Sequence, residues 1–285
     1  MIHGRSQGGK IANELKATWT KTLQEGFSAC NATWPQTVQV DFPYYADLLD
    51  DFAARAGLPS TGDVAAKGPG QNVKYEQFMQ SALDELQANA EISDAEVQAQ
   101  VPDGVPQQKG PQNWWWVQAI ARAIDNRLEG VTSVTIETFL KDVFVYVSAP
   151  AVAKAVNAIV EKEITTEPTI VIGHSLGSVV AYNVLVKHAP NMALKKFITV
   201  GSPLGLRVIS SKLGLLSNPA GAGGWYNAYD DRDVVALNPL DDEYFPTTPG
   251  IENSRHVRNS TSNRHGIIGY LNDAAVAKQV ADALC

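Results

Sequence analysis

The sequence has few cysteines and no long apolar run. Only Cys30 and Cys285 occur in its 285 residues, and their spacing fits neither a zinc site nor a disulfide framework. A bridge between them is disfavoured, because thiols stay reduced in a chain without a secretion signal. No apolar run reaches the roughly 18 residues that a membrane span needs, and the first ten residues, MIHGRSQGGK, lack a signal-peptide core. We therefore expect a cytoplasmic protein without an integral membrane segment.

Basic residues are fewer than acidic ones. The chain has 23 Lys and Arg against 30 Asp and Glu, which gives a formal net charge of -7. Nucleic acids and anionic membrane surfaces select for clustered Lys and Arg, so neither is expected as the main partner. Hydrophobic residues make up 45% of the chain, which is enough for one large core. One domain with an insertion is therefore expected rather than two independent domains.

Short strand-like runs alternate with segments of helical length. The expected strands are 1–2, 37–42, 169–172, 196–200, 225–229 and 255–259, and the expected helices are 10–25, 150–165, 177–189 and 266–284. This alternation predicts parallel crossovers, and hence an α/β fold whose open, mostly parallel sheet carries helices on both faces. Ligands of such sheets bind at the carboxyl ends of the strands.

Residues 54–135 interrupt the alternation. Two turn-rich stretches, GLPSTGDVAAKGPGQN and VPDGVPQQKGPQN, flank an amphipathic helix whose apolar face holds Tyr75, Phe78, Met79, Leu83 and Leu86. We interpret 54–135 as a helical insertion into a core formed by 1–53 and 136–285. A lid or cap is the favoured role for this insertion, and cover for one sheet edge is the alternative.

Three tryptophans follow one another at Trp114 to Trp116. Consecutive residues cannot share one helical face, so at least one ring should leave the core unless a neighbouring element covers it. Packing under the insertion is the favoured interpretation, and a wall of an apolar substrate pocket is the alternative.

The stretch TIVIGHSLGSVVAYNVL, residues 169–185, puts a serine between a strand and a helix with almost no loop. Such a junction forces Ser175 into a cramped backbone geometry, which the flanking Gly173 and Gly177 tolerate. It lifts the hydroxyl off the sheet edge, next to the amides at the start of the helix, which can stabilise a developing negative charge. We interpret Ser175 as a nucleophile rather than a helix cap.

This motif resembles the nucleophile elbow of the α/β-hydrolase family, above all of its lipases and esterases. In that family the acid follows the nucleophile and the histidine comes last. The resemblance implies Asp233 as the acid, because a tyrosine lies four positions before it and apolar residues follow it, as in small bacterial lipases. Asp230 and Asp231 remain alternatives, since each could equally be a turn carboxylate.

The same resemblance implies His265 as the base, because it lies in SNRHGIIGYLND, shortly before the last helix. His256 is the rival. We expect the side chain of His174 to point away from the nucleophile, and we place His188 at the end of the following helix. A serine hydroxyl is a poor nucleophile until a base takes its proton. Imidazole as a side-chain type titrates near neutral pH, and a buried carboxylate can hold the ring in the useful tautomer.

An oxyanion hole requires two amide donors. The backbone N–H of Leu176, directly after the nucleophile, is one candidate. The family takes the other from the residue after a His-Gly pair, and MIHGRSQGGK resembles that loop, which implies the backbone N–H of Arg5. The strand before this pair is shorter here than is usual in the family.

Together these residues predict a serine esterase or lipase-like enzyme that hydrolyses carboxylic esters without a metal or organic cofactor. Its expected partner is a small-molecule or lipid ester. A thioesterase, an amidase or a phospholipid acyl hydrolase would use the same residues, and a non-catalytic binding protein could retain the fold.

Overall fold

The computed structural model describes residues 1–285 except 6, 71, 111 and 128–135. In this described part the chain forms one four-stranded sheet in the order β1-β2-β3-β4. The strands are β1 (Thr169–His174), β2 (Leu194–Val200), β3 (Trp225–Ala228) and β4 (Glu252–Ser254). Every neighbouring pair is parallel, so the predicted α/β class with a parallel sheet is confirmed.

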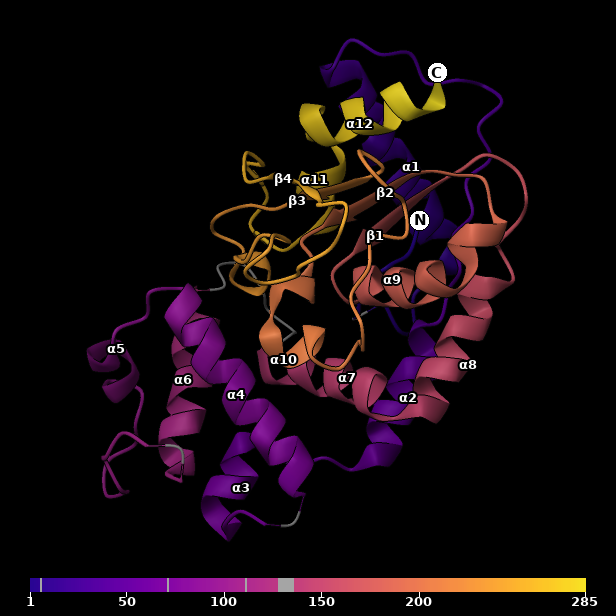
Figure 1. The fold of residues 1–285 in the computed structure, drawn as a ribbon. Coiled ribbons are helices and arrows are strands. Elements are labelled where there is room, and N and C mark those ends of the chain that lie inside the picture. The colour runs from indigo at the N-terminus through magenta and orange to yellow at the C-terminus, as the bar shows by residue number, and fades with distance from the viewer. Residues whose placement is uncertain (6, 71, 111, 128–135) are drawn as a thin grey trace.

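Helices surround this sheet (Figure 1). Before β1 the chain forms α1 (Ala12–Ala29), α2 (Ala46–Ala56), α3 (Thr61–Lys67), α4 (Val73–Asn89), α5 (Asp94–Gln98), α6 (Trp114–Arg127), α7 (Ile136–Ser148) and α8 (Pro150–Glu161). From β1 onward it adds α9 (Leu176–His188), α10 (Arg207–Ser210), α11 (Ile267–Leu271) and α12 (Ala274–Leu284), with short 3-10 turns η1 (Ala189–Asn191), η2 (Pro203–Gly205) and η3 (Val234–Ala236).

The two faces of the sheet have separate cores, because successive strand residues point to opposite sides. Ile172, Ile198 and Tyr226 pack on one face against α1, α11 and α12. Phe197 and Trp225 pack on the other face, which α9 covers together with α7 and α8 (Figure 1). The sheet is thus the middle of three layers, and β1, β2 and β3 end in buried residues.

Helices α3 to α6 lie together on one side of the sheet, below and to the left in Figure 1. Their apolar residues belong to the same core as those of α7 and α9, and the ring of Phe144 on α7 contacts Tyr75 and Phe78 on α4. Capping boxes at Ser60 and Ser93 begin α3 and α5. Trp114 and Trp116 are buried and Trp115 is half-buried, as packing of most of this run predicts.

Two predicted strands do not form. Residues 37–42 contain no strand. Phe42 instead packs its ring on His3 and Trp19, and none of the strands in the described part of the chain pairs with this segment. Residues 255–259 lie just beyond β4 and form a loop, because the N–H of Asn259 donates to the buried carboxylate of Asp230, 2.7 Å away, instead of to a strand.

Two other predictions need adjustment. The first strand shrinks to a single bridge between Ile2 and Gly173, although the N–H of Ile2 does bond to the carbonyl of Ile172 at 2.8 Å. The last helix is split between α11 and α12, because Asp273 accepts bonds from the N–H groups of Ala275 and Val276 and so begins a new helix.

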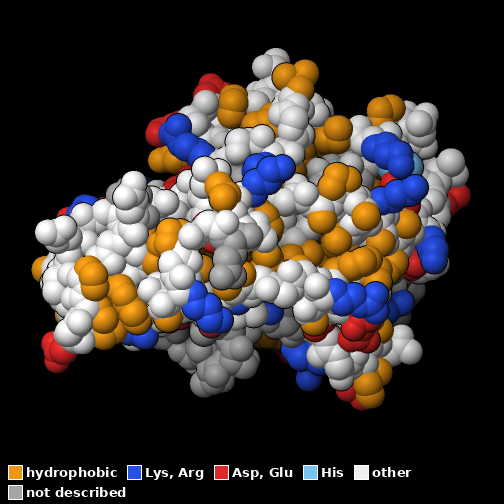
Figure 2. All heavy atoms as spheres, turned by 90° about the horizontal axis from the view of Figure 1, so that it is seen from below, with side chains coloured by type: hydrophobic (Ala, Val, Ile, Leu, Met, Phe, Trp, Pro, Cys, Tyr) orange, Lys and Arg blue, Asp and Glu red, His pale blue; other side chains and the backbone are white. Residues whose placement is uncertain are grey.

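No single helix in the described ranges is long and apolar enough to cross a membrane. By length and composition alone, α7 and α8 pass that test jointly, but a bend of 92° separates them. Figure 2 views the molecule from below, and apolar side chains gather on the half of this face where α2, α7 and α8 lie in Figure 1.

Candidate active site

Ser175 lies at the tip of the turn between β1 and α9. Its backbone has φ 55° and ψ -134°, a conformation that residues other than glycine rarely adopt. Strain of this kind costs about 1–3 kcal/mol and persists only where the surroundings impose it. A Cβ at Gly173 would lie 2.8 Å from the Cα of Ser178, and one at Gly177 would lie 2.3 Å from the carbonyl oxygen of Ile2. The two glycines therefore permit the tight packing that holds Ser175 in this turn.

The structure brings Ser175, His265 and Asp233 into one hydrogen-bonded chain. The Oγ of Ser175 lies 2.7 Å from the Nε2 of His265, and the Nδ1 of His265 lies 2.8 Å from the Oδ2 of Asp233. A carboxylate only accepts, so the ring proton belongs on Nδ1 and Nε2 is free to accept from the serine hydroxyl. Asp233 is fully buried, whereas 17% of the His265 side chain is exposed.

Two further donors hold the carboxylate of Asp233. The N–H of Val235 donates to Oδ1 at 3.1 Å, and the hydroxyl of Tyr270 donates to Oδ2 at 2.7 Å. Burial, then the neighbouring charge of Asp233, raises the pKa of Tyr270 well above its usual value, so this hydroxyl keeps its proton. The backbone N–H of Asp230 donates to the same tyrosine oxygen at 3.2 Å.

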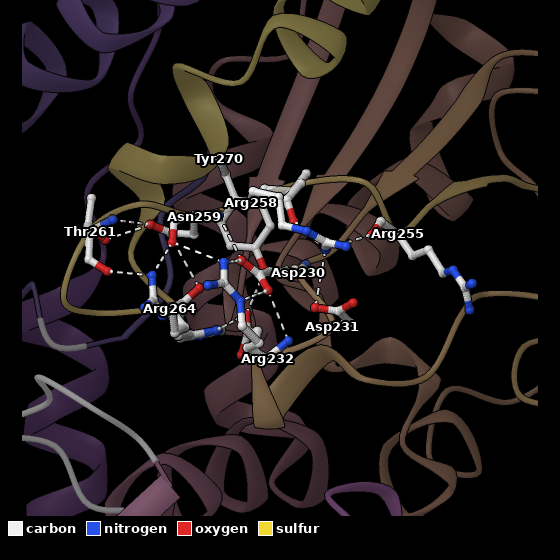
Figure 3. A network of polar contacts seen from close by, with 12 residues as sticks. Asp230, Asp231, Arg232, Arg255, Arg258, Asn259, Thr261, Arg264 and Tyr270 are labelled. Atoms are coloured by element: carbon white, nitrogen blue, oxygen red, sulfur yellow. Dashed lines mark hydrogen bonds and ion pairs between the residues drawn. The ribbon is translucent and has the colours of Figure 1, made fainter.

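The other two aspartates of this loop, Asp230 and Asp231, have partners of their own (Figure 3). Asp230 is buried and accepts bonds from the guanidinium of Arg232 and from the N–H of Asn259. Burial alone would raise the pKa of Asp230, but these bonds outweigh it and leave that pKa lowered. Asp231 is exposed and forms an ion pair with Arg258 at 3.2 Å. Of the three carboxylates, only that of Asp233 contacts His265.

The other histidines also have defined surroundings. His256 is exposed, and the Nε2 of His188 lies 3.0 Å from Glu161. His3 is buried, with Nδ1 donating to the carbonyl of Gly4 at 2.6 Å and Nε2 accepting from the N–H of Tyr45 at 3.2 Å. Burial lowers the pKa of His3 to about 4, so this ring is neutral near pH 7.

Sequence reasoning gave His174 no part in the site. Its ring nevertheless lies 5.0 Å from the ring of His265, and its Nε2 lies 2.8 Å from the carbonyl oxygen of His265. Burial lowers the pKa of His174 to about 3, with the neighbouring His265 adding to the effect. Sequence reasoning also did not predict the bond of Asn259 to Asp230 or that of Tyr270 to Asp233. No local sequence signal indicates these contacts, because they form only when the loops fold together.

The two candidate oxyanion donors both adjoin Ser175. Leu176 is the first residue of α9, where an amide has no acceptor within the helix. Gly4 packs so closely that a Cβ there would lie 2.7 Å from the Cβ of Ser175, which places the Gly4–Arg5 peptide beside the hydroxyl. The guanidinium of Arg5 is bound to the buried carboxylate of Asp142 on α7. Among the described residues, neither the Arg5 nor the Leu176 amide bonds to a backbone carbonyl.

Two hollows of the described structure lie in the helical segment rather than at Ser175. One, of about 650 Å³, is lined by Trp114 and Trp115 together with residues of α3 and of the loop before α6. The other, of about 300 Å³, is lined by Trp116 and by residues of α4, of the loop after it and of the loop before α6. Ser175, Asp233 and His265 line neither, so the hollows that these tryptophans line are separate from the candidate site.

Within the ranges that the structure describes, no group of three or more His, Cys, Asp or Glu side chains could hold a metal ion. Cys30 and Cys285 are both free thiols. Comparison of the chain with protein-family models, with curated proteins and with solved structures finds no match.

Proposed function

We propose that this protein is a serine hydrolase that cleaves carboxylic esters and that its α/β fold is an α/β-hydrolase fold. The observation that carries the proposal is the unbroken hydrogen-bonded chain from the Oγ of Ser175 through the ring of His265 to the carboxylate of Asp233. The strained backbone of Ser175 supports it, because strain of this kind gathers at functional sites.

Each member of the chain would have a distinct role. Ser175 attacks the acyl carbonyl carbon while the Nε2 of His265 takes the hydroxyl proton. His265 then gives that proton to the departing alcohol, which leaves an acyl-enzyme on Ser175. A water molecule repeats the sequence with His265 as the base again, and the acid is released. Asp233 keeps the ring in the useful tautomer and stabilises the imidazolium.

The tetrahedral intermediates carry a negative charge on the former carbonyl oxygen. The N–H groups of Leu176 and Arg5 are the proposed donors to this oxygen, since both peptides adjoin Ser175. The bond between the Arg5 side chain and Asp142 on α7 supports this role, because a donor held in place before the reaction needs no reorganisation during it.

A thioesterase, an amidase or a phospholipid acyl hydrolase would use the same five residues. If residues 54–135 act as a lid over the site, activity should rise steeply once a long-chain ester exceeds its solubility limit. A cap over a small pocket would give ordinary saturation instead.

The direct test is hydrolysis of p-nitrophenyl esters, from acetate to palmitate, by the wild type and by Ser175→Ala. Loss of activity in Ser175→Ala, with activity kept in Ser210→Ala, would support the proposal, because Ser210 is a buried serine outside the hydrogen-bonded chain. The preferred acyl length would then indicate how long an acyl chain the substrate site accommodates. Hydrolysis that survives Ser175→Ala would contradict the proposal, and absence of hydrolysis of every ester, thioester and amide would favour a binding protein.

A further inference from the structure

Three successive backbone carbonyls around His265 each accept a hydrogen bond from a buried side chain. The Nδ2 of Asn259 donates to the carbonyl of Arg264 at 3.0 Å and to that of Gly266 at 2.8 Å. The Nε2 of His174 donates to the carbonyl between them, that of His265 itself, at 2.8 Å. These bonds hold the loop from the inside of the protein.

The donor to His265 comes from the strand that carries the nucleophile. His174 is the last residue of β1 and directly precedes Ser175, and its ring is buried between Trp19, Tyr270 and His265. A carbonyl oxygen can only accept, so the proton of the neutral His174 ring is on Nε2. Because burial lowers its pKa to about 3, this donor keeps one form throughout the pH range in which an esterase would be assayed.

Two bonds therefore join the end of β1 to His265. The side chain of Ser175 bonds to the ring of His265, and the side chain of the preceding residue bonds to its backbone. The second bond limits how far the backbone of His265 can move relative to Ser175, although 90 residues separate the two in sequence. A displacement of about 1 Å between reacting groups can lower a rate by about 100-fold.

We propose that His174 is a positioning residue that holds the backbone of His265 at the distance from Ser175 that proton transfer requires. This inference rests on the proposed hydrolase function. It is distinct from a packing role, because packing needs only a ring of the right size, whereas positioning needs a donor that reaches the carbonyl of His265.

The test compares three substitutions at this position. In His174→Gln the side-chain nitrogen reaches about as far from Cα as the Nε2 of histidine and can donate to the same carbonyl. In His174→Asn the amide is the same but the reach is too short, and His174→Leu fills space without a donor. Thermal unfolding of each variant accompanies measurement of kcat and KM on the best p-nitrophenyl ester.

We expect His174→Gln to keep kcat within about threefold of the wild type, while His174→Asn and His174→Leu lose about 10- to 100-fold in kcat at nearly constant KM. Equal kcat in folded His174→Gln and His174→Asn would overturn the inference, whether both are active or both are impaired. Such a result in an enzyme that Ser175→Ala inactivates would leave the proposed function intact. A wild type that hydrolyses nothing would count against the function itself.

A second measurement uses the wild-type protein alone and does not depend on enzymatic activity. In the wild-type protein labelled with ¹⁵N-histidine, the Nε2 of His174 should carry a proton and the Nδ1 should not, unchanged from about pH 5 to pH 8. An unprotonated Nε2 at this residue would overturn the inference, because such a nitrogen cannot donate to the carbonyl of His265.

Discussion

The Oδ2 of Asp233 lies 2.8 Å from the Nδ1 of His265, although 32 residues separate the two in sequence. The carboxylate that makes this bond is itself fixed, because Val235 donates to one of its oxygens and Tyr270 to the other. It is also fully buried. A carboxylate with this many donors has one orientation, and it imposes that orientation on the imidazole ring.

Asp233→Asn should therefore lower kcat by about 10⁴-fold while leaving the protein folded. An amide in place of the carboxylate can present its NH₂ group to His265, which then keeps its proton on Nε2, where it blocks acceptance from Ser175. The matched control is Asp231→Asn in the same loop, which removes only an exposed ion pair and should leave kcat within about twofold of the wild type. Ester hydrolysis by both variants is the measurement, and equal activities would show that Asp233 is not the orienting acid.

Tyr270→Phe tests the second donor to the carboxylate. The phenylalanine keeps the ring and removes the hydroxyl that bonds to Asp233 and to the N–H of Asp230. We expect a loss of about 1–3 kcal/mol in the free energy of unfolding and a fall of about tenfold in kcat, because Asp233 then has more freedom to move. The control is Tyr244→Phe at a half-buried tyrosine that does not contact Asp233. A Tyr270→Phe variant that matches the wild type in both respects would refute the role of this hydroxyl.

Gly177 should not tolerate a side chain. In Gly177→Ala the new Cβ would lie 2.3 Å from the carbonyl oxygen of Ile2 and 2.4 Å from that of His3. Both are backbone atoms, so relieving the overlap requires the backbone to move. We expect a loss of at least about 1–3 kcal/mol in stability, as overpacking typically costs, together with most of the activity. Gly250→Ala is the control, because nothing lies within 4 Å of its Cβ position. Urea unfolding of the two variants measures the difference.

Stability should fall as the pH is lowered through the range below about 6.5. Burial lowers the pKa of His3 to about 4 and that of His174 to about 3, whereas both have the usual value of 6.5 once unfolded. Between these values the unfolded chain binds more protons than the folded one, so protonation favours unfolding. Each histidine then removes up to about 1.4 kcal/mol of stability for each unit of pH.

Urea unfolding at neutral pH and near pH 5 measures this dependence. His174→Gln has no titrating ring at this position. The slope of its free energy of unfolding against pH should therefore be smaller than that of the wild type by the contribution of about one proton. His256→Gln at an exposed histidine is the matched control. Identical slopes in the wild type and His174→Gln would mean that the ring of His174 is not kept neutral by burial.

Much of the architecture around the nucleophile follows from local signals. Four strand-forming residues, a glycine on each side of Ser175 and an apolar helix after it predict the turn without any knowledge of the rest of the chain. The loops that carry Asp233 and His265 are predictable from their places after a strand and before a helix, and the structure brings both residues to Ser175. Their catalytic roles remain a prediction.

What the sequence could not reveal depends on partners distant along the chain. Residues 37–42 have strand-like composition but pair with no strand, because aromatic contacts of Phe42 hold them instead. The choice among Asp230, Asp231 and Asp233 depends on where Arg232 and Arg258 lie in the folded loop. His174 contacts the carbonyl of His265, 91 residues away in sequence, and no periodicity or motif predicts such a contact.

The most direct test of the central claim is labelling of the folded protein with a fluorophosphonate probe, followed by peptide mapping. We predict covalent labelling at Ser175, absent in Ser175→Ala and greatly slowed in Asp233→Asn, since only an activated serine displaces the fluoride. Labelling at another serine, or none in protein shown to be folded, would contradict the claim that Ser175 is a nucleophile activated by His265.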